Sequence, residues 1–177
     1  MSKRKDIVPT ENELVMRDDE FIVSKTDIKG RITYVNRVFI DISGYEEQEL
    51  IGIQHNVIRH PDMPRGVFRM LWDEIQDGRE IFAYVKNMCK DGSYYWVLAN
   101  VTPSVDVNGS TIGYYSVRRK ANPRAIPIVA ELYRKMLSAE RQAGARDAIG
   151  ASREVLQQVL NDKGMSYEEL VLSLQSI

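Results

Sequence analysis

Strand-like and helical stretches alternate along the chain, and short polar turns separate them. Five strand-like runs lie beside turns that pair glycine with Asp or Asn, and glycine accepts the positive φ that a tight reversal needs. The pattern therefore predicts hairpins. The predicted strands are Phe21–Lys25, Arg31–Val35, Glu80–Met88, Tyr94–Val105 and Thr111–Lys120.

Helical spacing fills the interval between the second and third strands. Asn36 is placed to cap a short helix that Gly44 ends, because an Asn side chain can accept a hydrogen bond from an orphan N–H. Pro64 can open a second helix with a strongly apolar face, which Gly78 ends. Residues 45–63 hold a proline, a glycine and both histidines, which predicts short turns and loop.

The element order divides the chain into three parts. Residues 20–120 predict an α+β domain, a five-stranded antiparallel sheet with helices on one face. Residues 1–19 read as an arm or cap, and residues 121–177 as a helical region for signalling or dimerisation. Two apolar stripes, at 126–137 and 148–160, exceed what the sheet domain needs, so a homodimer is expected. The alternative is that these helices fold back on the open face of their own sheet.

Composition narrows the function classes. Of 177 residues 44% are hydrophobic, which is globular, and 24 basic against 25 acidic residues leave no electrostatic case for nucleic acid or anionic membrane. One cysteine, Cys89, and two histidines, His55 and His60, exclude an internal disulfide and a Cys/His zinc cluster. The chain has no apolar run long enough for a signal peptide or membrane span, so we expect a soluble cytoplasmic protein.

Three sequence motifs carry a resemblance to a known family. They are HNVIRHPDMP at 55–64, VKNMCKDGSYYWVLANVTP at 85–103 and GYYSVRR at 113–119. With the element order, they resemble the flavin-binding PAS domain of bacterial aerotaxis and energy-taxis receptors. The helical tail looks like the short soluble form of that system, in which the PAS protein signals to a separate membrane-bound chemotaxis transducer.

The resemblance implies a non-covalently bound FAD whose redox state reports on respiratory electron flow. It also implies that the RHPDMP loop and the asparagine of VKN lie at the flavin, with Asn36 a further candidate and Trp72 a possible ring contact. The candidate cofactor-binding residues are Asn36, Arg59, His60, Asp62, Trp72 and Asn87. Family receptors carry a tryptophan shortly after the glycine that ends the long helix, whereas this chain has Ile81, so Phe82 or Trp72 would have to supply that wall.

The residue types leave several roles open. A flavin ring needs an apolar slot, polar groups at its pyrimidine edge and positive charge where reduction makes it anionic. Arg59 suits either that charge or the FAD pyrophosphate. Asp62 suits a proton relay, although an Asp in H-P-D-M-P equally caps a turn, which we favour. Trp72 lies on a helical apolar stripe and is as well explained as core.

Four functions from different classes remain. The leading one is a redox-sensing binding module without turnover. A haem gas sensor would use His60 or His55 as axial ligand. A flavoenzyme would need an acid/base pair and substrate space that about one hundred residues hardly leave, and the fourth reading is a cofactor-free interaction domain. Blue-light adduct chemistry is disfavoured because HNVIRHPDM contains no cysteine.

Overall fold

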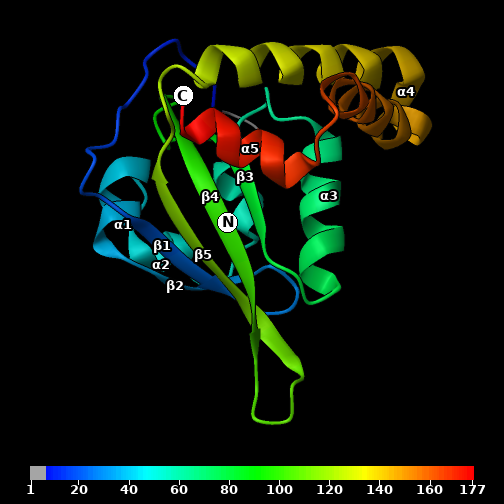
Figure 1. Ribbon diagram of the computed structural model, residues 1–177. Helices are drawn as coiled ribbons and strands as arrows, with labels where there is room; N and C mark the ends of the chain where they lie inside the picture. The colour runs from blue at the N-terminus through cyan, green and yellow to red at the C-terminus, as the bar shows by residue number, and fades with distance from the viewer. Residues whose placement is uncertain (1–6) are drawn as a thin grey trace.

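The computed structural model describes residues 7–177 and places five strands in one antiparallel sheet (Figure 1). The spatial order is β2-β1-β5-β4-β3, so the first and last strands along the chain, β1 and β5, meet in the centre. The strand bounds are β1 Ile22–Thr26, β2 Ile32–Val35, β3 Ile81–Met88, β4 Tyr94–Val105 and β5 Thr111–Lys120. The predicted α+β fold is confirmed, and these bounds differ from the predicted ones by one residue at most.

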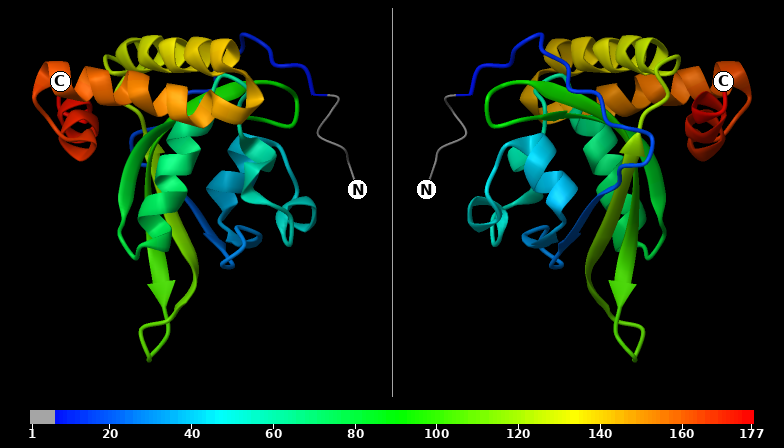
Figure 2. Two further views of the ribbon diagram at one scale, coloured as in Figure 1. Left: turned by 90° about the vertical axis from the view of Figure 1, so that its right-hand side faces the viewer. Right: turned by 90° about the vertical axis from the view of Figure 1, so that its left-hand side faces the viewer.

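Four helical elements between β2 and β3 cover the inner face of the sheet (Figure 2). They are α1 Arg37–Ser43, α2 Glu47–Leu50, the 3₁₀ turn η2 His55–Ile58, and α3 Arg65–Gln76. Asn36 caps α1 as predicted, since its Oδ1 accepts from Phe39 N at 3.1 Å, and Gly44 ends that helix at φ 73°. Pro64 lies one position earlier than predicted, as the cap residue of α3.

In the C-terminal region, helix α5, Tyr167–Gln175, lies on the opposite, outer face of the same sheet, while helix α4, Ile126–Lys163, runs across one end of the sheet and packs on α3. Figure 2 shows α5 across the sheet from α3. Tyr133 Oη donates to the carbonyl of Tyr84 at 2.7 Å, and the Tyr84 hydroxyl donates to Gln175 Oε1 at 2.9 Å. Helices therefore lie on both faces once the tail is included.

A break divides α4 into two halves that sequence spacing did not predict. Gly144 has φ 75° and ψ 173°, which are not helical, so the second half takes a new direction (Figure 2). The break lets both apolar stripes reach their own domain. Val129, Tyr133 and Met136 of the first stripe are buried, as are Leu156 and Leu160 of the second.

This packing removes the reason for which a homodimer was expected. The stripes are covered within one chain, but the alternative is met only in part: α5 packs on the open face of the sheet, whereas α4 packs mainly on α3. The homodimer stays a prediction without that support.

The N-terminal arm lies along the start of β4. Leu14 N donates to Tyr94 O at 2.7 Å, Tyr94 N donates to Asn12 O at 3.0 Å, and Met16 is buried in the core. Residues 1–6 of the predicted arm lie outside the described residues. Over residues 7–177, the helices lack the length and apolarity that crossing a membrane requires.

Candidate functional site

A cavity of about 160 Å³ lies between the inner sheet face and the helices that cover it. That volume is roughly ten times the minimum that holds one water molecule. Side chains at every second position of four strands line it, because alternate residues of a strand face the same side. The lining strand residues are Ser24, Thr26, Val85, Asn87, Ala99, Val101, Tyr114, Ser116 and Arg118.

Aromatic and aliphatic side chains of α3 form the opposite wall. Phe68, Leu71 and Trp72 line the cavity, and the Trp72 ring meets Tyr114 edge to face with centroids 5.4 Å apart. Gly30, at φ 76°, gives Trp72 its place, since a Cβ there would lie 3.0 Å from the indole ring. This wall would present flat apolar surface to a planar ligand.

Phe82 and Trp72 are the two candidates to replace the tryptophan that family receptors carry, and of these Trp72 lines the cavity. Ile81 packs instead in a small cluster with Ile75 and Tyr114, and neither Ile81 nor Phe82 is part of the lining described. Tyr114, which the sequence did not single out, adds an aromatic ring to those of Phe68 and Trp72.

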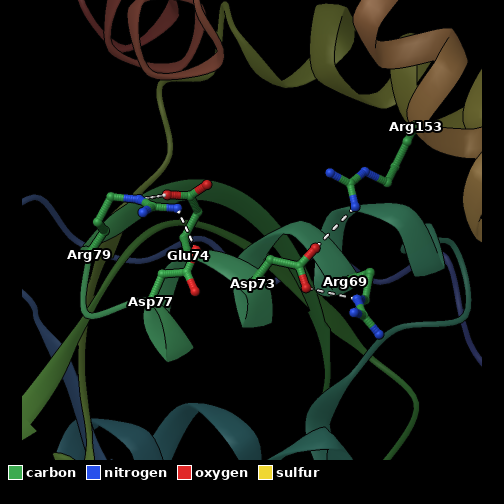
Figure 3. A network of polar contacts seen from close by, with 6 residues as sticks. All are labelled: Arg69, Asp73, Glu74, Asp77, Arg79 and Arg153. Atoms are coloured by element: carbon green, nitrogen blue, oxygen red, sulfur yellow. Dashed lines mark hydrogen bonds and ion pairs between the residues drawn. The ribbon is translucent and has the colours of Figure 1, made fainter.

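Polar network contacts hold α3, and with it the apolar wall, against α4 (Figure 3). The Asp73 carboxylate accepts from Arg69 Nε at 2.8 Å within α3 and from Arg153 Nη1 of α4 at 3.0 Å. Arg79 closes the far end of α3 on Glu74 at 2.6 Å. Because these groups are largely exposed, the contacts orient the helix more than they stabilise it.

Asn87 and Arg59 meet at the edge of the cavity. The backbones of the two residues form an isolated antiparallel bridge that ties the loop after η2 to β3. Arg59 Nη2 donates to Met63 O at 2.8 Å, and its guanidinium lies 4.2 Å from the Phe68 ring centroid. The Asn87 side chain is 3% exposed, and its Nδ2 has no hydrogen-bond partner within residues 7–177.

Arg118 is the charged residue of the cavity that sequence reasoning missed. It is 2% exposed, its Nη2 donates to Ser24 Oγ, and its Nε and Nη1 have no partner in the described part of the chain. Burial lowers its pKa to about 10, which leaves it charged at neutral pH. A signal was available, since Arg118 alternates with Tyr114 and Ser116 in the GYYSVRR motif and so shares their face.

His60 and Asp62 are neighbours on the side of β3 away from the lining. Asp62 N donates to His60 Nδ1 at 3.1 Å, and the Asp62 carboxylate accepts from Lys86 Nζ at 2.7 Å. Burial and the Lys86 charge lower the pKa of His60 to about 4, so the ring is neutral at pH 7. The Asp62 carboxylate thus forms an ion pair, in place of the turn cap that the sequence favoured.

Asn36 also lies outside the cavity lining. Its amide accepts from Val23 N at 3.0 Å and from Phe39 N, and donates to Phe21 O at 2.8 Å. The structure therefore brings Arg59, Trp72 and Asn87 together at one cavity and leaves Asn36, His60 and Asp62 off it; cofactor binding by all six stays a prediction.

His55 lines the cavity as a neutral hydrogen-bonded ring. Its Nε2 lies 3.1 Å from Ser24 Oγ, and burial, with the charge of Arg118, lowers its pKa to about 3. The ring nitrogen that a haem iron would need is thus engaged by Ser24.

We expect acid to destabilise the protein through these two histidines. An unfolded histidine titrates near pH 6.5, so below that pH the unfolded state takes up protons that folded His55 and His60 exclude. The free energy of unfolding should then fall by roughly 1.4 kcal/mol per pH unit for each histidine between pH 6.5 and 5. Denaturant titrations at pH 7, 6 and 5 measure the slope, and His55→Gln should halve it. A flat profile would mean that both rings already carry a proton when folded.

The donor set of the cavity fits an acceptor-rich ring such as flavin. The unpartnered atoms, Asn87 Nδ2 and Arg118 Nε and Nη1, are all donors, and the lining given by residues 7–177 contains no Asp or Glu. It also contains no cysteine, while Cys89 donates to Ile42 O at 3.1 Å elsewhere. A planar ligand with several carbonyl acceptors would satisfy these donors.

The chain is similar to known proteins that contain a PAS domain. A model of the PAS fold matches residues 32–118. The aerotaxis receptor of Escherichia coli K12 is 41% identical over 132 residues, 75% of this chain and 26% of the receptor. A nitrogen fixation regulatory protein of Klebsiella pneumoniae is 25% identical over 97 residues, 55% of this chain and 20% of that protein. The chain thus spans about a quarter or less of these relatives.

Solved structures agree on the fold. A light-oxygen-voltage domain studied with a flavin analogue superposes with a TM-score of 0.55 at 20% identity, covering 63% of this chain and 83% of that one. The light state of the blue-light photoreceptor Aureochrome1 LOV gives 0.54 at 21% identity, over 67% and 90%.

Proposed function

The chain carries a PAS domain, and on that premise we propose that it is a redox sensor that binds FAD non-covalently in the cavity. The likeness to the aerotaxis receptor supports a role in taxis signalling. In this proposal the protein is cytoplasmic, catalyses no turnover, and passes the redox state of its flavin to a membrane-bound chemotaxis transducer.

The observation that carries the proposal is the set of buried, unpartnered donors beside an aromatic wall. Leaving a buried donor unpaired costs about 1–3 kcal/mol, and Asn87 and Arg118 together leave three such atoms in the described chain. A ligand with acceptors along one edge removes that cost. The lining described for residues 7–177 holds no carboxylate that could pair with these donors.

The bound flavin would supply two-electron redox chemistry. Asn87 and Arg118 would hold its polar edge, and Trp72 with Phe68 would exclude water from its faces. Arg59 retains two roles, at the ring or at the FAD pyrophosphate.

Two physical connections lead from the cavity to the C-terminal helices. β3 presents Asn87 to the cavity and Tyr84 to the tail, where the Tyr84 carbonyl accepts from Tyr133 of α4. α3 presents Trp72 to the cavity, and its Asp73 accepts from Arg153 of α4. A change in ligand charge that shifts either element would reach α4 of the C-terminal region.

We expect the purified full chain to be yellow, with flavin absorption bands at close to one flavin per chain. The bound flavin, released by heat and separated by chromatography, should be FAD rather than FMN. A Soret band would point to haem instead, and a spectrum with neither, before and after incubation with FAD, would contradict the proposal. In Arg59→Ala we expect most of the flavin to be lost, at a fold that circular dichroism shows to be unchanged.

The predicted homodimer is settled by light scattering on the full chain at micromolar concentration. A monomer is the result that the covered stripes favour. A dimer would have to use a surface other than the buried faces of α4.

A further inference from the structure

Arg118 is a buried cation without a carboxylate partner within residues 7–177. The ion pairs of the described chain do not include it, and the residues that line the cavity with it include no acid. Burying a charge without a counter-charge is costly. A ligand that brings negative charge to this cavity would offset that cost.

Ser24 holds the guanidinium of Arg118 at Nη2, and Arg118 lines the cavity. Ser24 Oγ accepts from Arg118 Nη2 and lies 3.1 Å from His55 Nε2. Because burial keeps His55 neutral, Nε2 can accept the hydroxyl proton, and Ser24 then uses both of its roles. The guanidinium carbon lies 5.1 Å from the Phe39 ring centroid, which packs the group from a further side. Nε and Nη1 remain for a ligand.

Arg59, the other arginine of the lining, has a different setting. Arg59 is only partly buried, and its Nη2 donates a hydrogen bond to the Met63 carbonyl. Its guanidinium lies over the Phe68 ring. Coulomb interactions strengthen as water is excluded, so the deeper arginine acts more strongly on charge that develops in the cavity.

We propose that Arg118 stabilises the reduced over the oxidised flavin in this cavity and so sets the reduction potential of the sensor. The inference rests on the proposed flavin site. Near neutral pH, two electrons from a reduced electron carrier and one proton from solvent convert the neutral oxidised ring to a monoanion. The charge in the cavity falls by one, and a fixed cation stabilises that product more than the reactant.

The test is the midpoint potential of the FAD-loaded full chain, titrated against a reference dye and followed by absorbance. In Arg118→Met, which keeps volume and removes charge, affinity for reduced flavin should fall at least a hundredfold more than affinity for oxidised flavin. At 29.6 mV per tenfold for two electrons, the potential then drops by about 59 mV. Arg118→Lys keeps the charge and should recover most of that shift.

The matched control is Arg119→Met, which removes an exposed arginine from the opposite face of β5, outside the cavity lining. It should leave the potential near that of the wild type. An unchanged potential in Arg118→Met overturns the proposal, as does an equal drop in Arg119→Met. If the methionine variant does not retain FAD, Arg118→Gln with excess FAD replaces it, with the same drop expected and a wild-type potential again overturning the assignment.

Failure of the flavin site itself would look different. In that case the wild type would show no flavin bands even after incubation with FAD, and no potential could be measured for any variant.

Discussion

Replacing Asn87 with leucine should weaken FAD binding roughly five- to 150-fold, because a flavin acceptor would then be buried without its donor at a cost of about 1–3 kcal/mol. In the flavin-free protein, the same substitution should not destabilise the fold. The amide Nδ2 has no partner in the described chain, so leucine removes an unsatisfied buried group and should not lower the melting temperature. Fluorescence titration with FAD and thermal unfolding of the flavin-free protein measure the two effects.

The matched control for this prediction is Asn36→Ala. The structure commits the Asn36 amide to three backbone groups, so its loss should cost about 1 kcal/mol of stability through the cap of α1 and leave FAD affinity unchanged. An equal loss of affinity in both variants would instead favour the family resemblance, which places Asn36 at the flavin. Unchanged affinity in Asn87→Leu would remove Asn87 from the site.

Gly66→Ala should destabilise the protein by about 1–3 kcal/mol, the usual cost of overpacking. A Cβ at Gly66 of α3 would lie 2.5 Å from Ser152 Oγ and 2.8 Å from Ser152 Cβ of α4. Gly66 N also donates to the buried carboxylate of Glu140 at 3.0 Å, so the two helices are tied at this point. Since α3 carries Trp72 and Phe68 into the cavity, separation of the helices should also lower FAD affinity.

Gly150→Ala is the control, because Gly150 lies near Ser152 in α4 and a Cβ added there would meet no atom within 4 Å. There alanine should stabilise the helix by about 0.5–1 kcal/mol. Ser152→Gly, combined with Gly66→Ala, should cost less than the sum of the two single changes, since it removes the colliding atoms. Denaturant unfolding of the four variants measures this coupling, and additive effects would show that Gly66 and Ser152 do not limit the helix approach.

Local rules were sufficient for the elements of this protein. A tight turn needs glycine or Asn whatever surrounds it, and an N-cap needs only the next three residues, so the strand bounds and the Asn36 cap followed from neighbours in the sequence. The family motifs added Asn87 and Arg59 as candidates for one site, and the structure places both residues, with Trp72, in the lining of one cavity.

Charge at the site depended on contacts between distant segments. Alternation in β5 placed Arg118 on the face of Tyr114, but only the pairing of β5 with β1 brings it to Ser24, and only the covering helices bury it. His60 has the right chemistry for a flavin ligand and lies next to Arg59, yet its ring accepts a hydrogen bond from Asp62 N, and Asp62 in turn pairs with Lys86. Which of two adjacent loop residues enters a cavity is a property of the loop's path, which no periodic pattern encodes.

In the C-terminal helices, too, the sequence determined which side is buried and the tertiary structure decided what covers it. Their apolar stripes determined that α4 and α5 bury one side, because exposed apolar surface is costly wherever it lies. They did not determine what covers that side, since an apolar helix face can be buried equally well against another copy, a partner or its own domain. The break at Gly144 decided between these outcomes by redirecting half of α4 onto α3, and glycine in a helix either continues or ends it according to the packing that the tertiary structure offers.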